Sequence, residues 1–416
     1  MVNATPALGH GPLAPFVCPA LVLIVLVLTG CAPTLSYTVD LRDARSGTVA
    51  VRMRLRRATG DSLVLRGHGS SAEMRIQGIE VDARGSAGFI VDSLPSGGGF
   101  APRIVIRGPL PYSVTVRYRV TPGGREGDAH GGWTGRSYGE VHEHGMSATG
   151  RGLFLLPTRA ARIERIWARF KRPAGWDVIV PWHRGEGWWR PGVRRRFAAE
   201  DLLGSALGFG TFHMRSVRVD ATNYRLAIDA RIGQAEGDRT VDALERVIRV
   251  VHGAFGRGPG ARYTIVVSPE SGTGDALIGS GWASGQGGTL SPVTASRLHG
   301  FARRLIDAYL PHAPYRIAAH DAREQWVIDA IGEVLAWRAV ARAGFADEAQ
   351  VARDLAGAYA EALDLGETKG GLEEPDPDPV KAEVIAPLAL LCLERELKRA
   401  GGDGLDPVFR AMFASN

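Results

Sequence analysis

The spacing of apolar residues changes once along the chain, and this change limits the folds available to it. From residue 36 to about residue 119, apolar side chains recur at every second position, as in Val49-Ala50-Val51-Arg52-Met53 and Val114-Thr115-Val116-Arg117-Tyr118. Gly, Pro, Asp and Ser separate these runs. A period of two, punctuated in this way, is typical of antiparallel strands with one buried face. We therefore expect an amino-terminal antiparallel β-sandwich.

After residue 236 the period becomes helical. Val241, Leu244, Val247 and Val251 fall on one helix face, and Ser291-Pro292 has the residue types of a helix start. The sequence predicts an α+β chain whose carboxy-terminal half is mainly helical. Two short strands and four further helices are expected there, at about 224–228, 263–267, 321–343, 347–365, 380–400 and 406–413, with Pro387 kinking one helix or shifting its start.

We expect three segments: a leader over 1–30, a β-rich domain over 31–220 and a mostly helical domain over 221–416. The 416 residues carry a net charge of +6, but no long Lys/Arg block and no basic stripe with interleaved aromatic residues. This pattern argues against a nucleic-acid partner. Three cysteines in an exported chain exclude a disulfide framework, and Cys392 is expected in a helical core.

The leader ends in a short aliphatic run, 21–28, followed by Thr29-Gly30-Cys31. The run is too short for a comfortable membrane span. Residues 28–31 resemble a bacterial lipobox, which implies cleavage before Cys31 and acylation of its thiol. Ala32 then favours the outer membrane, facing the periplasm. No Lys or Arg precedes the run, which departs from the lipobox pattern, so an ordinary signal peptide or an uncleaved anchor remains the alternative.

A series of segments resembles, in the same order, the glycyl aminopeptidase family of gluzincin zinc metallopeptidases. These segments are 37–40, 49–53, 114–120, 152–157, 388–402 and 405–410. The resemblance spans 37–413 and implies a thermolysin-like helical domain. It does not include the PDZ domain that often follows in that family. The family's chemistry depends on a His-Glu-x-x-His helix, in which two imidazoles bind zinc and the Glu activates water.

The segment that matches this helix is His299-Gly300-Phe301-Ala302-Arg303. His299 is kept. Gly300 replaces the general base and has no side chain, while Arg303 replaces the second ligand and has no lone pair to donate to a metal. We therefore expect no catalytic residues and no zinc.

Two further family segments are also altered. The resemblance places the third ligand at Asp329, in the run that starts at Trp326, where the family has Glu. It places Ala283, next to Trp282, where the family has the Glu that receives the substrate's amino end. The family's late-helix Tyr has no counterpart near 382–383. Four chemical roles are thus missing together.

Arg303 has an expected partner in this region. A guanidinium near Asp329 and Glu333 would take the place of the metal and balance the carboxylates, because an unpaired buried carboxylate is costly. The alternative is an Arg303 that points to solvent. The residues expected to line the remaining cleft are Trp282, His299, Arg303, Trp326, Asp329 and Glu333.

Two further groups of residues contain side chains of the kinds that bind metal ions. His142, Glu143 and His144, with His130 nearby, have ligand chemistry but no fourth ligand at fixed spacing, so a polar loop is favoured. A zinc site rebuilt from His299, His320 and Asp329 is the less favoured alternative to a metal-free cleft.

These observations indicate a lipid-anchored chain with a metallopeptidase-like fold that has lost catalysis. It would bind or scaffold a peptide or protein partner at the cell envelope. The alternatives are a zinc aminopeptidase with an atypical site and a purely structural envelope protein.

The lipid anchor is directly testable. Cys31→Ala should abolish labelling of the chain by a palmitate analogue in cells, because the acceptor thiol is gone. The Cys392→Ala chain, which keeps the acceptor, serves as the control. Undiminished labelling of Cys31→Ala would contradict the anchor.

Overall fold

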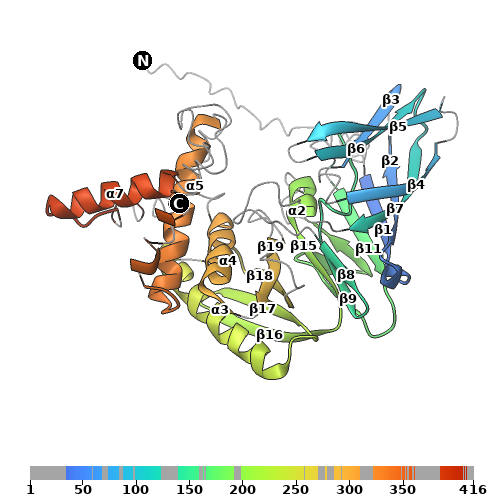
Figure 1. The fold of residues 1–416 in the computed structure, drawn as a ribbon. Coiled ribbons are helices and arrows are strands. Elements are labelled where there is room, and N and C mark those ends of the chain that lie inside the picture. Colours follow the sequence, from blue (N-terminus) through green and yellow to red (C-terminus); the bar gives the residue numbers. More distant parts are fainter. Residues whose placement is uncertain are drawn as a thin grey trace, which may run out of the picture.

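A computed structural model of the chain shows a mixed α/β fold. It describes residues 34–58, 60–67, 74–83, 88–96, 99–122, 139–158, 163, 165–191, 198–256, 258–269, 277–278, 285–291, 293–309, 322–347, 349–351, 353, 356–357, 360, 385–405, 407 and 409. The leader and Cys31 lie outside these residues. Figure 1 shows the sheets of the first half on one side and most of the helices on the other.

The amino-terminal half is built on a seven-stranded sheet in the order β13-β14-β11-β1-β2-β7-β4. Its strands are β1 (Thr34–Asp40), β2 (Val49–Arg56), β4 (Met74–Asp82), β7 (Ser113–Pro122), β11 (Arg165–Lys171), β13 (His183–Gly185) and β14 (Trp188–Arg190). The expected alternation is present in β2, where Val49, Val51 and Met53 are buried. One pairing differs from the expected antiparallel pattern, because β1 and β11 are parallel.

Two four-stranded sheets complete this half. One has the order β10-β3-β6-β5 and the other β12-β15-β9-β8. Their strands are β3 (Ser62–Arg66), β5 (Gly88–Ser96), β6 (Gly99–Arg107), β8 (Gly139–His142), β9 (Gly145–Thr149), β10 (Leu156–Pro157), β12 (Asp177–Ile179) and β15 (Ala206–Gly210). The short helix α2 (Ala198–Gly204) leads into β15. The Gly- and His-rich composition of residues 122–150 predicts a long loop, and this prediction is wrong at its end, where β8 and β9 form a hairpin.

The core of this half contains a buried turn at residues 153–155, where the apolar run Leu153-Phe154-Leu155 predicts a strand. Residues 153–155 are not extended; they wrap around two tyrosines. The hydroxyl of Tyr118 donates to the carbonyl of Leu153 (3.0 Å) and accepts from the amide of Leu155 (3.2 Å). Tyr37 donates to the carbonyl of Leu155 at 2.5 Å. Burial raises the pKa of Tyr118 and of Tyr37, so both hydroxyls stay protonated.

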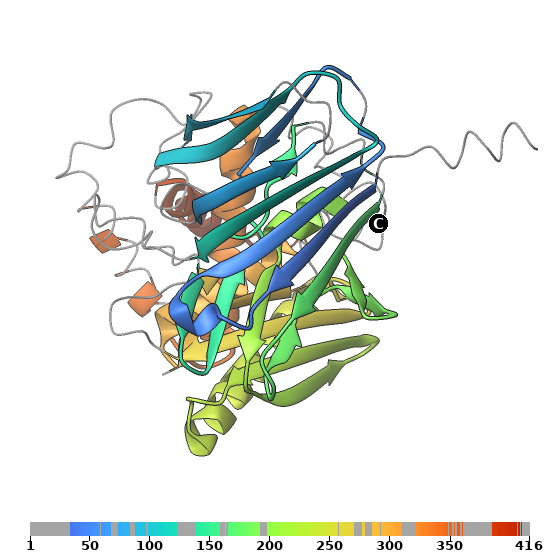
Figure 2. The same ribbon diagram turned by 90° about the vertical axis from the view of Figure 1, so that its right-hand side faces the viewer.

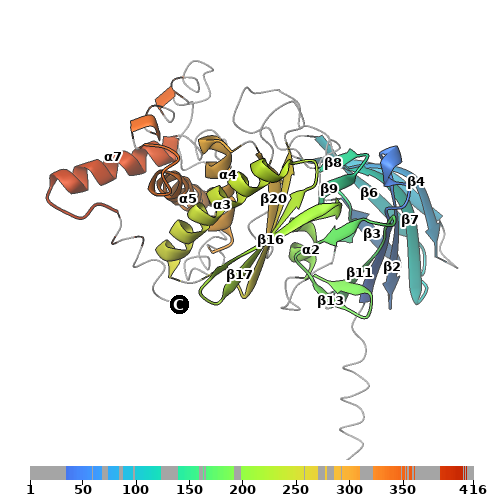
Figure 3. The same cartoon turned by 90° about the horizontal axis from the view of Figure 1, so that it is seen from below.

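The second half begins with a five-stranded sheet in the order β16-β17-β18-β20-β19. Its strands are β16 (Phe212–Val219), β17 (Thr222–Asp229), β18 (Arg262–Pro269), β19 (Leu277–Ile278) and β20 (Gly285–Ser291). β19 is antiparallel to β20 at the edge of the sheet. The β16–β17 hairpin spans the expected domain boundary at 220. Figure 3 shows helices on one side of this sheet and the sheets of the first half on the other.

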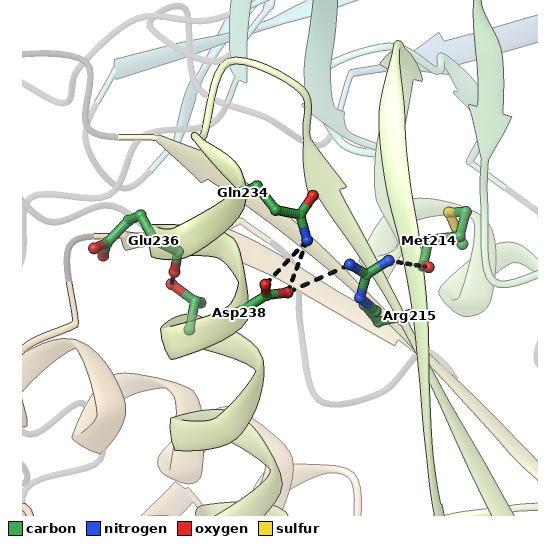
Figure 4. Close-up of polar contacts among 6 residues, drawn as sticks. Met214, Arg215, Gln234, Glu236 and Asp238 are labelled. Carbon is green, nitrogen blue, oxygen red and sulfur yellow. Dashed lines mark hydrogen bonds and ion pairs between the residues drawn. The ribbon is translucent and has the colours of Figure 1, made fainter.

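The helix α3 (Gln234–Phe255) lies against this sheet and matches the helical period seen in the sequence. Its first residues are fixed to β16 by polar contacts (Figure 4). Asp238 accepts from Gln234 (2.9 Å) and from Arg215 (3.3 Å). These contacts compensate for Gly233, which occupies the N-cap without a capping side chain.

A buried chain of polar groups joins the other end of α3 to the end of α4 (Ala295–Asp307). The hydroxyl of Tyr224 lies 3.0 Å from that of Tyr309 and 3.2 Å from Nδ1 of His252. Nε2 of His252 lies 2.9 Å from Asp220. Burial raises the pKa of Tyr224 to about 12. This network fixes where α4 ends.

Three expectations for the helices need comment. α4 begins at Ala295, not at Ser291-Pro292, because the Thr294 side chain accepts from the amide of Arg297 and caps the helix. α5 (Ala322–Arg342) matches its expected range. α7 (Ala386–Arg399) has Pro387 in its first turn, and residues 380–384 of the expected helix lie outside the described residues.

Cys392 was expected in a core but is exposed on α7. α7 is held to α5 by the ion pair of Arg338 with Glu394 and by apolar contacts. Across the described residues, no helix is long and apolar enough to cross a membrane.

The buried tyrosine of β7 generates a stability prediction. Tyr118→Phe should lower the free energy of unfolding by about 1–3 kcal/mol, because it leaves a buried amide and a buried carbonyl without partners. Urea denaturation measures this change. A matched control is Tyr112→Phe at an exposed position, which should change stability by less than about 0.5 kcal/mol. Equal effects from both substitutions would contradict the role of the Tyr118 hydroxyl.

Candidate functional site: a closed ion-pair cluster between two helices

The residues at the expected zinc position lie where α4 packs against α5. Leu298, Phe301, Ala302 and Leu305 bury one face of α4 in the main core of the second half. This burial leaves His299 and Arg303, which are one turn apart, on the side that faces α5. The side chains of His299, Arg303 and Glu333 are only 10, 13 and 14% exposed. The cluster is therefore a low-dielectric site in which charges must be paired.

Arg303 is paired on two sides. Its Nε lies 3.1 Å from Oε1 of Glu333 on α5, and its Nη1 forms an ion pair with Asp307 one turn further along α4. The expectation that Arg303 pairs with a carboxylate of this region is confirmed for Glu333. The alternative, an Arg303 directed to solvent, was wrong. Asp307 was not anticipated as a partner, although its i,i+4 spacing from Arg303 was visible in the sequence.

His299 contacts the second oxygen of the same carboxylate. Its Nε2 lies 2.8 Å from Oε2 of Glu333. The imidazole also stacks on Trp337 of α5, with ring centroids 4.1 Å apart and planes inclined by 17°. Glu333 and Trp337, both on α5, thus occupy the space beside the His299 ring.

Glu333 remains ionised in this setting. Burial is the largest single influence and raises the pKa of its carboxyl group. His299, Arg303 and Arg304 together outweigh burial, so the pKa of Glu333 lies below its usual value. The anion that the two helices share is therefore present at neutral pH.

Gly332 makes room for the guanidinium. A Cβ added at this position would lie 2.6 Å from Cζ of Arg303 and 2.8 Å from its Nε. Real Cβ atoms essentially never approach so closely, so any larger residue would displace Arg303. An α-helix interior disfavours glycine by about 1 kcal/mol relative to alanine. The glycine at 332 is therefore matched to the arginine at 303, a relation that the sequence did not reveal.

The remaining expected site residues fall partly outside the described residues. Gly300 lies on α4 between His299 and Phe301, with no side chain to offer. Trp326 and Asp329 lie on α5, but their side chains are not described, and Trp282, Ala283 and His320 fall outside the described ranges. Of the residues expected to line the cleft, His299, Arg303 and Glu333 are those whose side chains the structure describes.

The histidine group at residues 142–144 lies where β8 turns into β9. Glu143 and His144 connect β8 to β9 and are 77% and 60% exposed. His130 lies outside the described residues, and nothing is described of the His142 side chain. Among the side chains that are described, no group of three His, Cys, Asp or Glu residues is placed to hold a metal ion.

The sequence matches no protein-family model and no curated protein. Solved structures do match. An aminopeptidase N family protein from Idiomarina loihiensis aligns with a TM-score of 0.65 and 14% identity, over 91% of this chain and 70% of that one. An M1 zinc metallopeptidase from Deinococcus radiodurans gives a TM-score of 0.47 and 15% identity, over 92% and 85% of the two chains.

The chain has an aminopeptidase N-like fold. At 14% identity the likeness to the Idiomarina protein concerns the fold alone. It supports the metallopeptidase-like architecture expected from the sequence. The chemistry at His299, Arg303 and Glu333 has to be argued from these residues themselves.

The fit between Gly332 and Arg303 is testable by one methyl group. Gly332→Ala should lower the free energy of unfolding by about 1–3 kcal/mol, because the added Cβ overlaps the guanidinium and outweighs the gain in helix propensity. The control is Gly253→Ala on α3, where an added Cβ meets nothing within 4 Å. This control should stabilise the chain by up to about 1 kcal/mol. A stabilising Gly332→Ala would show that Arg303 lies elsewhere.

Proposed function

We propose that this chain is a lipid-anchored envelope protein that uses an inactivated metallopeptidase fold to bind or scaffold a peptide or protein partner. The second half would then be a gluzincin-type helical domain without its metal. The observation that carries the proposal is the pairing of Arg303 with Glu333 at the position where the sequence resemblance places a zinc ligand.

The donor set at this position does not suit zinc. A catalytic zinc site uses three protein ligands and one water. Here His299 and Glu333 are the described candidates, and the guanidinium of Arg303 already lies 3.1 Å from the same carboxylate. Two like charges about 4 Å apart repel by roughly 4 kcal/mol per pair of unit charges at an effective dielectric constant of 20. A divalent ion beside Arg303 would meet about twice that repulsion.

Hydrolysis would also lack its proton acceptor. In the family that the sequence resembles, the residue after the first His is a Glu that activates water. Gly300 stands there and carries no titratable group. Glu333 is engaged with Arg303 and His299 and is not free to replace it. These substitutions remove metal, ligand and base together, which supports a binding role over catalysis.

A binding role fits what the chain retains. The α4–α5 pair and the sheet beside it persist although the ligands are replaced, and the ion pairs hold the two helices together without a metal. The partner would bind in the cleft that the sequence resemblance implies beside these helices. The lipobox-like leader would keep this surface at the envelope membrane.

Metal analysis and peptidase assays test the proposal together. Purified protein incubated with zinc and dialysed should hold less than about a tenth of an equivalent of zinc, because Arg303 repels a cation at this position. Glycyl and alanyl amide substrates should not be cleaved above the rate of a zinc-only control. Stoichiometric zinc together with amino-terminal cleavage, both lost in His299→Ala, would establish instead an aminopeptidase with an atypical site.

A further inference from the structure

The outward face of the seven-stranded sheet carries an array of basic residues. Because side chains alternate across a strand, the residues between the buried Val51, Met53 and Leu55 point away from the core. Figure 2 shows this face in front, with the helices behind it. Seven basic side chains are exposed on it: Arg52, Arg56, Arg117, Arg119, Arg165, Arg169 and Lys171. We call this surface the basic face.

The strand register places these residues in rows across the sheet. In one row Arg169, Thr38, Arg52 and Arg117 are successive neighbours on β11, β1, β2 and β7. In another, Arg165, Thr34 and Arg56 are neighbours. The middle strand β1 contributes short Ser and Thr side chains, so the long arginines stand on both sides of a shallower line of hydroxyls. Guanidinium and hydroxyl groups are both donors to phosphate oxygens.

Few acidic groups compensate this charge. Asp40, Glu80 and Asp82 are the acidic residues on the same face, at its margins. Glu80 lies 3.6 Å from Arg117, and Asp40 lies 4.0 Å from Lys171. Within the described part of the chain, Arg52, Arg56, Arg119, Arg165 and Arg169 have no ion pair.

This arrangement of like charges destabilises the sheet when no anion is bound. Arg52 and Arg117 lie directly opposite each other on β2 and β7, and like charges in that position destabilise a sheet. An external anion would relieve this repulsion. A wide, flat array of this kind matches a flat array of anions better than it matches a single small ligand.

The position of the proposed lipid anchor, Cys31, indicates which partner the basic face contacts. Cys31 precedes Thr34, the first residue of β1, by three residues, and β1 lies between β11 and β2 in the middle of the sheet. Three residues span at most about 10 Å. An acyl chain on Cys31 therefore brings the Thr34 end of the basic face, with Arg56 and Arg165, to within about 10 Å of the lipid headgroups.

We propose that the basic face rests on the anionic phospholipid headgroups of the membrane that holds the anchor. The proposal deepens the proposed function, since it takes lipid anchoring at Cys31 as its starting point. Together the acyl chains and the basic face give two membrane contacts, which orient the sheet toward the membrane and leave α4 and α5 on the far side.

The experiment uses the chain from residue 32 to residue 416, which holds every described element and no acyl group. Binding is measured by sedimentation with vesicles of phosphatidylcholine alone and with vesicles that also contain one-third phosphatidylglycerol, at low and at physiological salt. The chain should bind only the anionic vesicles and should dissociate as salt rises. Binding to neither vesicle at low salt, or equally to both, would overturn the proposal.

Substitutions locate the contact. Arg52→Gln, Arg117→Gln and Arg169→Gln together should lower the partition coefficient on anionic vesicles by about one hundredfold, at about fivefold per charge. The matched control removes three exposed charges elsewhere, with Arg218→Gln, Arg239→Gln and Arg249→Gln. This control should retain binding within about threefold. Equal losses in the two triple variants would indicate a net-charge effect and overturn the assigned face.

The outcomes separate the anchor from the surface. Vesicle binding by a chain without lipid depends only on the basic face, whereas palmitate labelling depends only on Cys31. Millimolar inorganic phosphate should not displace the chain, because single phosphates do not reproduce the array. Displacement by phosphate at that concentration would assign a free-anion site instead of a membrane contact.

Discussion

The contact of Arg303 with Glu333 joins two helices, α4 and α5, that pack against each other. Each partner is nearly buried, so neither charge is tolerated alone, and each is satisfied by the other and by Asp307 or His299. The guanidinium supplies the positive charge that the carboxylate needs. Gly332 supplies the space for it. The buried carboxylate thus has a cation that is part of the chain itself.

The elements around this ion pair are held by contacts of their own. α4 still buries its apolar face against the five-stranded sheet, and Tyr224, His252 and Tyr309 still fix the helix ends at the base of that core. α5 in turn carries α7 through Arg338 and Glu394. The architecture therefore remains available for binding. The opposite side of the molecule, the basic face, provides a separate surface whose chemistry suits a membrane.

The sequence predicted the regular parts of the fold because their signals are local. The period of two in β2 and β7 and the helical period in α3 each follow from one buried face. It misplaced features that depend on competition or on distant partners. Thr294 outcompeted Ser291 as a cap through its bond to the Arg297 amide, and the hydroxyl of Tyr118 turned Leu153 and Leu155 away from a strand. Cys392 lies on the exposed side of α7, whose leucines pack against α5 on the other side.

The candidate site was predictable in part for the same reason. Spacing along α4 identified His299, Gly300 and Arg303, and charge balance indicated a carboxylate partner. The choice of Glu333, the stacking of Trp337 and the space above Gly332 depend on how α5 packs, which no local pattern encodes.

The proposed function requires that Arg303 take the place of a metal ion. Its most direct test is a crystal of the protein soaked in zinc, with diffraction data collected on both sides of the zinc absorption edge. We expect no anomalous peak between His299 and Glu333, and we expect the guanidinium of Arg303 to remain at ion-pair distance from Glu333. A strong peak bound by His299 and Glu333, with Arg303 swung away, would contradict it.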